Sequence, residues 1–154
     1  MGQGTEVLFN DFAHGVLQGR YDFRSGGTDI EVMLITNAVV PLKTDTTPEK
    51  ADYTECSGGT YSAQALANQD AVLAGTKANA VADDITFAQD AGAGPVDCYY
   101  AVAYDDDAPD PCLWFWDLTK DGGTTPLSLR DAPIILNLGA GTRQLFYTSI
   151  PANV

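Results

Sequence analysis

The sequence predicts an all-β fold, an antiparallel β-sandwich of about eight strands with one short N-terminal helix. Several segments alternate apolar and polar residues with a period of two, which is typical of strands. Gly, Ser and Thr are plentiful, while charged residues make up only 19% of the chain, a composition that favours β-structure with many turns. Helices and strands do not alternate along the chain, so a parallel α/β sheet is not expected.

The 154 residues, of which 45% are hydrophobic, suffice for one domain with a sizeable core. We assign residues 1–8 to an N-terminal arm and residues 9–154 to a single β-sandwich domain. Residues 9–19 predict the helix, with Asn10 or Asp11 as the candidate N-cap. Its apolar residues recur at helical spacing and are Phe12, Val16 and Leu17.

The first strand is predicted at residues 29–36, where apolar side chains alternate onto one face. Residues 37–56 contain two prolines among clustered Thr, Asp and Lys and predict a loop. A turn at Gly139–Gly141 joins the last two strands. The strands after the loop are expected at 58–67, 70–75, 83–89, 98–104, 112–118, 133–139 and 144–150. The side chains expected in the core are Ile30, Val32, Leu34, Val102, Phe115, Ile134 and Leu136.

Residues 99–118, YYAVAYDDDAPDPCLWFWDL, predict a hairpin. Both flanks alternate with period two and are rich in aromatic residues, and Asp and Pro concentrate in the connection because both favour turns. A solvated turn is the favoured interpretation of its acids, with a weak calcium site as the alternative. These acids are Asp105, Asp106, Asp107 and Asp110. Trp114 and Trp116 share a parity, so both fill the core or both form an exposed aromatic face for a partner.

The formal net charge of −13 disfavours nucleic acids and anionic membranes as partners, so neither is expected. We recognise no secretory signal and no apolar run long enough to span a bilayer, which predicts a protein folded in a cytoplasm. The three cysteines are widely spaced and form no CxxC, which argues against a disulfide framework and a zinc site. Cys98 and Cys112 lie at opposite ends of the predicted hairpin, about 20 Å apart, which is too far for a disulfide. We expect buried thiols at Cys56, Cys98 and Cys112.

The sequence predicts no enzyme, and we assign no catalytic residue, cofactor or metal site. His14 is the only histidine and lies in the predicted helix, where a packed or surface role is more common than a catalytic one. Motifs of serine hydrolases, zinc proteases, P-loop proteins and dinucleotide-binding proteins are absent from the sequence. Carboxylate pairs for glycoside hydrolysis remain an alternative, because their separation cannot be read from sequence.

Short motifs follow one another in a characteristic order. A helix that ends in GRYD is followed by DIEVMLIT, SGGTYSA, DDITFA, YYAVAYDD, LWFWDL and LNLGAGT. This order resembles a family of small tailed-bacteriophage virion structural proteins, in which a short helix precedes TDxIKVALL-like, SGxGYxAGG, DDVTW-like, RYAVLYDD and LIxxIDFG motifs. The resemblance covers roughly residues 9–140. Two stretches depart from the family, since TYSAQALA replaces the glycine-rich AGG and LWFWDLTKDGG is more aromatic than usual.

The resemblance implies an accessory structural protein of the phage particle, assembled in the host cytoplasm and located in the virion. The expected function is capsid decoration or cementing, with the major capsid protein and copies of this chain as partners. A neck, tail or fibre component that binds host glycans is the alternative. We expect residues 1–9 to grip a neighbouring subunit as an added strand, unless they fold back on their own domain. The expected interface side chains are Val7, Leu8, Phe9, Phe12, Trp114 and Trp116.

Overall fold

Antiparallel strands and one short α-helix dominate the computed structural model. The structure describes residues 4, 6–74, 77–119, 121, 123–138 and 146–149. For residues 73–74, 77–78 and 146–149 it describes the backbone alone. The elements in chain order are β1 (Glu6–Leu8), α1 (Asn10–Leu17), β2 (Ile30–Ile35), the 3₁₀ turn η1 (Lys50–Asp52), β3 (Gln64–Ala65), β4 (Asp70–Ala74), β5 (Lys77–Val81), β6 (Ile85–Phe87), β7 (Tyr100–Asp105), β8 (Cys112–Asp117), β9 (Ile134–Leu136) and β10 (Phe146–Ser149). The prediction of an all-β fold with one short helix is confirmed.

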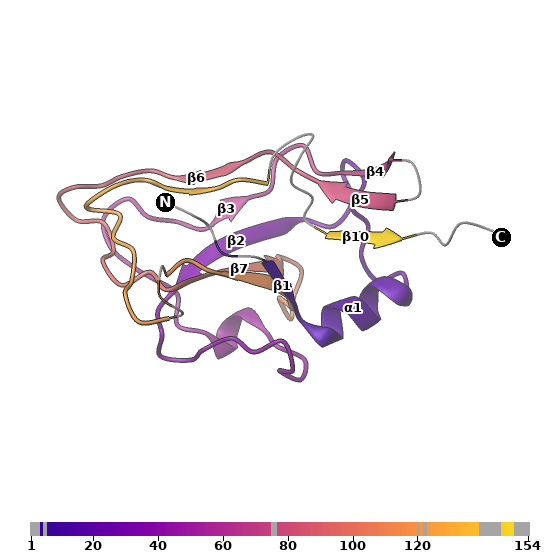
Figure 1. Ribbon diagram of the computed structural model, residues 1–154, viewed down its shortest axis with the longest axis horizontal. Coiled ribbons are helices and arrows are strands. Elements are labelled where there is room, and N and C mark those ends of the chain that lie inside the picture. The colour runs from indigo at the N-terminus through magenta and orange to yellow at the C-terminus, as the bar shows by residue number, and fades with distance from the viewer. Residues whose placement is uncertain are drawn as a thin grey trace.

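The largest sheet has five strands in the order β1-β8-β7-β2-β3 and forms the centre of the molecule (Figure 1). β7 and β8 form the predicted hairpin, in which Val102 pairs with Phe115 and a bulge follows Ala103. In the connection, the Asp105 carboxylate accepts a hydrogen bond from the Asp107 N–H at 3.2 Å. The turn therefore follows the local chemistry that its Asp residues favour.

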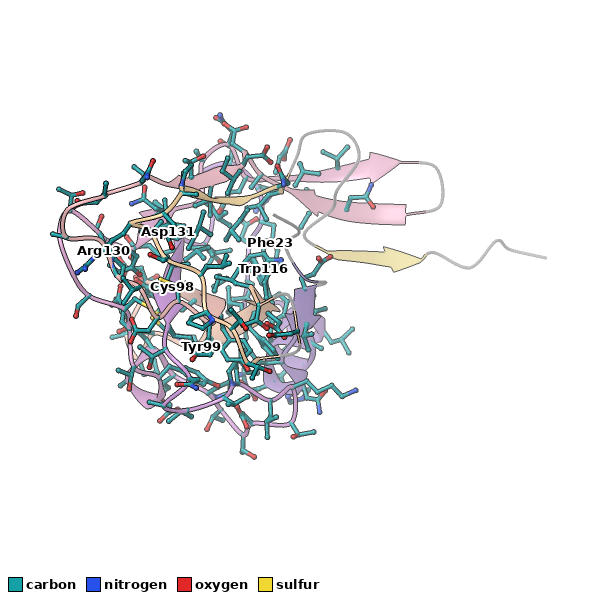
Figure 2. The ribbon with its side chains drawn as sticks, turned by 60° about the vertical axis from the view of Figure 1, so that its left-hand side comes forward. Phe23, Cys98, Tyr99, Trp116, Arg130 and Asp131 are labelled. Atoms are coloured by element: carbon teal, nitrogen blue, oxygen red, sulfur yellow. The ribbon has the colours of Figure 1, made fainter. Side chains whose placement is uncertain are left out.

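Two smaller sheets accompany the central one. β6 pairs with β9, and β5 pairs with both β4 and β10. Figure 1 shows β6 running along the top of the central sheet, and Figure 2 shows the pink strands β4 and β5 and the yellow strand β10 extending to the right of the main body. The last two predicted strands thus pair with different partners, and the turn predicted at Gly139–Gly141 lies outside the described residues. A sandwich arrangement of the sheets remains a prediction.

The predicted core residues are all buried. They are Ile30, Val32, Leu34, Val102, Phe115, Ile134 and Leu136. Met33 and Ile35, on the opposite face of β2, are buried as well. β2 lies between β7 and β3 and is covered on both faces, so alternation along this strand does not separate an inner from an outer face.

The helix differs from the prediction at its start. Phe9 occupies the N-cap position without a side-chain hydrogen bond, so neither predicted cap is used, because the helix follows β1 directly. Gly15 lies inside the helix and is buried, and a Cβ atom there would come within 2.6 Å of the Tyr21 ring. Glycine at this position therefore lets the ring pack closely against the helix.

Three elements of the fold, β1, β5 and η1, were not predicted from the sequence. β5 is rich in Ala and Asn, which have low strand propensity, and its pairing with strands on both sides overrides that preference. The loop predicted at 37–56 contains η1 and takes part in two isolated bridges, Ile35–Glu55 and Glu49–Pro111. β5 and the bridges depend on distant partners, whereas η1 is closed locally by a capping box between Glu49 and Asp52.

Candidate interaction surfaces

Four of the six predicted interface side chains lie in the core. Phe9, Phe12, Trp114 and Trp116 are at most 1% exposed, and Trp116 lies among the interior side chains in Figure 2. The rings of Phe12 and Trp114 are 5.6 Å apart, and Trp114 meets Trp116 edge-on at 6.0 Å. The interface prediction is wrong for these four, because α1 packs on β8 and covers its aromatic face.

Residues 6–8 lie in the protein's own central sheet. β1 pairs antiparallel with β8, so that Leu8 faces Trp114. The prediction that the arm grips a neighbouring subunit is therefore wrong for these residues, while residues 1–3 and 5 lie outside the described part. The edge of β8 offers main-chain hydrogen bonds within the same chain. β1 leads directly into α1, which packs on β8, so placing β1 on this edge costs less entropy than ordering the arm on a second molecule. The remaining predicted interface side chains, Val7 and Leu8, are partly buried against the core.

The acidic turn of the hairpin borders a hollow of about 340 Å³, whose lining includes Asp11, Tyr21, Glu49, Asp105 and Asp107. Burial raises the pKa of the Asp105 carboxyl; the hydrogen bond from the Asp107 N–H opposes this rise, while the nearby carboxylates of Asp107, Asp29 and Asp106 add to it. Within the part of the chain that the structure describes, no group of three or more His, Cys, Asp or Glu side chains is arranged to hold a metal ion. The observed chemistry is that of an acidic hollow with one partly buried carboxyl.

A polar cluster links η1 to the central sheet. The Lys50 ammonium donates a hydrogen bond to the Tyr104 hydroxyl at 2.8 Å and lies 4.3 Å from the centre of the same ring. The Tyr104 hydroxyl in turn donates to the Glu31 carboxylate. Burial and this carboxylate raise the pKa of Tyr104, so its hydroxyl stays protonated and serves to hold the loop rather than to act as a nucleophile.

The single histidine lies on the surface of α1. His14 is exposed, and its Nε2 lies 3.1 Å from the side-chain amide of Gln18 one turn later. This contact is local to the helix and brings no second titratable group to the imidazole. His14 therefore forms part of the solvated face of the helix.

The outer edge of β4 is the clearest candidate for binding another chain. Among the described residues no strand pairs with this edge, and it lies on the part of the molecule that extends beyond the body (Figure 2). Asp70, Ala71 and Val72 are exposed, with Val72 at 42%. The ladder to β5 has no bulge, and the sequence DAVLA has no Lys or Pro, although natural sheets commonly protect free edges with such features. This edge is able to accept a further strand.

A second exposed apolar segment lies in the loop before η1. Val39, Val40 and Leu42 are each about half exposed. The Asp45 carboxylate accepts hydrogen bonds from the Leu42 N–H and the Tyr53 hydroxyl, both at 2.9 Å. These bonds fix the loop against the buried Tyr53 ring and hold its apolar side chains at the surface.

Comparison with known proteins finds no relative of this chain. No family model, no curated protein and no solved structure matches the chain. In the described residues, no helix has both the length and the apolar character needed to cross a bilayer.

Proposed function

We propose that this protein is a structural component of a tailed-bacteriophage particle, a decoration protein that binds the major capsid protein and copies of itself and stabilises the shell. The observation that carries the proposal is the order of sequence motifs from the N-terminal helix to the LNLGAGT stretch. Each motif is short, so their order over most of the chain supports the proposal more than any one of them.

Exposed apolar surface supports a binding role. The free β4 edge carries Val72, and the loop of Val39, Val40 and Leu42 adds a second apolar segment. A decoration protein must hold its neighbours through surface that is available after its own core has formed. Exposed apolar patches and free strand edges are the features that commonly mark such binding sites.

In this proposal a strand of a neighbouring capsid-shell subunit adds to the edge of β4. Main-chain hydrogen bonds along the edge supply affinity, and contacts to outward side chains such as Val72 supply specificity. The net charge of −13 favours a partner surface that is basic or neutral and disfavours direct contact with packaged DNA.

Binding to empty capsids tests the function and the surface together. Val72→Lys places a charge on the β4 edge, a device that blocks strand addition, and should weaken capsid binding about tenfold or more, equivalent to about 1.4 kcal/mol. Ile135→Lys in β9 is the matched control, because Ile135 is 45% exposed and Val72 is 42% exposed. Particles assembled without the protein should also lose DNA at lower temperature or lower ionic strength.

The outcomes separate the alternatives. Equal capsid binding by Val72→Lys and Ile135→Lys would show that the β4 edge is not part of the interface, while the proposed decoration function would still stand. Wild-type protein that binds host cells and not capsids would replace the proposal with a tail or fibre role in glycan binding. No difference in particle stability with and without the protein would reject the cement role.

One observation favours an enzymatic alternative, a carbohydrate-active hydrolase. Such enzymes pair two carboxyl groups across a sugar and raise the pKa of the acid, and Asp105 has a raised pKa in an acidic hollow. Release of reducing sugars from host polysaccharide by the wild type, lost in Asp105→Asn, would support this alternative. We expect no release.

A further inference from the structure

Two of the three cysteines lie together in the interior. Cys56 and Cys98 are 3% and 0% exposed, and both are free thiols. The Cys56 N–H donates to the Leu34 carbonyl at 2.8 Å, which ties this residue to β2. Cys98 exchanges two main-chain hydrogen bonds with Leu127, of 3.1 and 2.8 Å. Main-chain bonds thus fix both residues in position before any bond forms between their side chains.

Their side chains touch. The Cys56 thiol donates to the Asp97 carbonyl at 3.8 Å, and Asp97 immediately precedes Cys98, which lies inside the body of the molecule (Figure 2). The Cys98 thiol is itself within hydrogen-bonding reach of the Cys56 thiol, and this contact together with burial raises the pKa of Cys56. The Cys56 thiol is therefore neutral in the folded protein, and it lies beside Cys98.

The third cysteine is placed differently. Cys112 opens β8 and faces Tyr104 on β7, at the far end of the hairpin from Cys98. It is buried, and the acids near it include Asp52 and Asp110. Cys112 therefore serves as an internal control for the other two thiols.

We propose that Cys56 and Cys98 form an intramolecular disulfide when the protein meets a small-molecule disulfide as oxidant, while Cys112 remains a thiol. One cysteine thiolate attacks a sulfur of the oxidant, whose S–S bond breaks and releases one small thiolate. The second cysteine thiolate then attacks the protein sulfur of this mixed disulfide and releases the other small thiolate. The two cysteines lose two electrons, the oxidant gains them, and the two cysteine protons end on the released thiols.

Contact between the thiols favours the second step. The Cys56 thiol lies 3.8 Å from the carbonyl oxygen of Asp97, the residue directly before Cys98, so the second cysteine is close by when the mixed disulfide forms at the first. Burial slows the first step, because the oxidant reaches a thiol only after local opening. The bond would tie the segment after the loop of residues 37–55 to the start of the β7–β8 hairpin.

The test uses the wild-type chain and hydroxyethyl disulfide, with and without low urea to allow local opening. After oxidation the protein is denatured, alkylated with iodoacetamide and fragmented by mass spectrometry. We expect alkylation at Cys112 alone and a protein mass about 2 Da lower before alkylation, since two hydrogens are lost. The oxidised protein should also melt about 5 °C or more above the reduced protein, because the bond closes a long loop.

Other results would overturn the proposal. Alkylation of all three cysteines after exposure in urea would show that the pair does not close. A bond that includes Cys112, or covalent dimers on a non-reducing gel, would show that a different pair reacts. An oxidised form that melts below the reduced form would show that the thiols are not placed for the bond. Cys112→Ala should still oxidise, and Cys98→Ala in the same background should not.

Discussion

A tyrosine hydroxyl completes the hydrogen bonding of the central strand β2. The Tyr61 hydroxyl accepts a hydrogen bond from the Leu34 N–H at 2.8 Å and donates to the Glu55 carboxylate at 3.0 Å. Leu34 is fully buried. β3 pairs with β2 only at Glu31 and Val32, so the Leu34 N–H lies beyond the end of that ladder. The Tyr61 hydroxyl therefore accepts the hydrogen bond that a main-chain carbonyl would accept if β3 were longer.

Tyr61→Phe should destabilise the protein by about 2–4 kcal/mol. An unpaired buried N–H at Leu34 costs about 1–3 kcal/mol, and the lost bond to the partly exposed Glu55 adds about 1 kcal/mol. The ring itself is kept, so its stacked contact with Phe87, at 5.9 Å between centroids, should be unchanged. The loss therefore reports on the hydroxyl and not on packing.

Urea unfolding measures the change, with Tyr99→Phe as the matched control. Tyr99 is half-buried against the core, and among the described residues its hydroxyl makes no hydrogen bond, so we expect this variant to remain within about 0.5 kcal/mol of the wild type. Amide exchange at Leu34 should also accelerate in Tyr61→Phe. A Tyr61→Phe variant as stable as the control, with unchanged exchange at Leu34, would refute the reasoning.

Phe115→Ala should cost about 3–5 kcal/mol by leaving a cavity in the core; a change within the error of urea unfolding would contradict its buried position. Deletion of residues 1–8 should lower the Tm of the isolated protein, because β8 loses its main-chain hydrogen bonds to β1. An unchanged Tm would show that β1 does not stabilise its own domain and would favour binding of these residues to a neighbouring subunit. Asp105→Asn should stabilise the fold at pH 7, because burial is the largest cause of the raised pKa of this carboxyl and disfavours its ionised form in the folded state. The gain should vanish as pH falls below the ordinary value of 3.8, and urea unfolding at both pH values measures it. Hydrogen bonds from Arg24 lower the pKa of Asp22 to about 2 from the ordinary 3.8, so its contribution to stability is present above pH 3.8 and lost as pH falls through about 2. An NMR titration should show the Asp22 pKa moving toward 3.8 in Arg24→Gln, and no movement would mean that the ion pair does not act in solution.

Local patterns in the sequence determined the central hairpin and most of the other strands, but not β1 or β5. Residues 98–118 alternate with period two on both sides of a turn rich in Asp and Pro, and they form β7, β8 and their connection. The choice depends on neighbouring residues alone, because side-chain alternation and turn chemistry act over a few positions. The same patterns identified Phe115 and the other predicted core residues as buried.

Only the tertiary structure decided which faces and edges are covered. The parity of Trp114 and Trp116 places them on one face, but whether that face meets a partner or the core depends on α1, which packs over it. The pairing of β1 with β8, and the contact between Cys56 and Cys98, join segments far apart in the chain. Sequence alternation carries no information about such pairings, because any strand edge can bond to any other through identical main-chain groups. The selection among them comes from the packing of the whole chain.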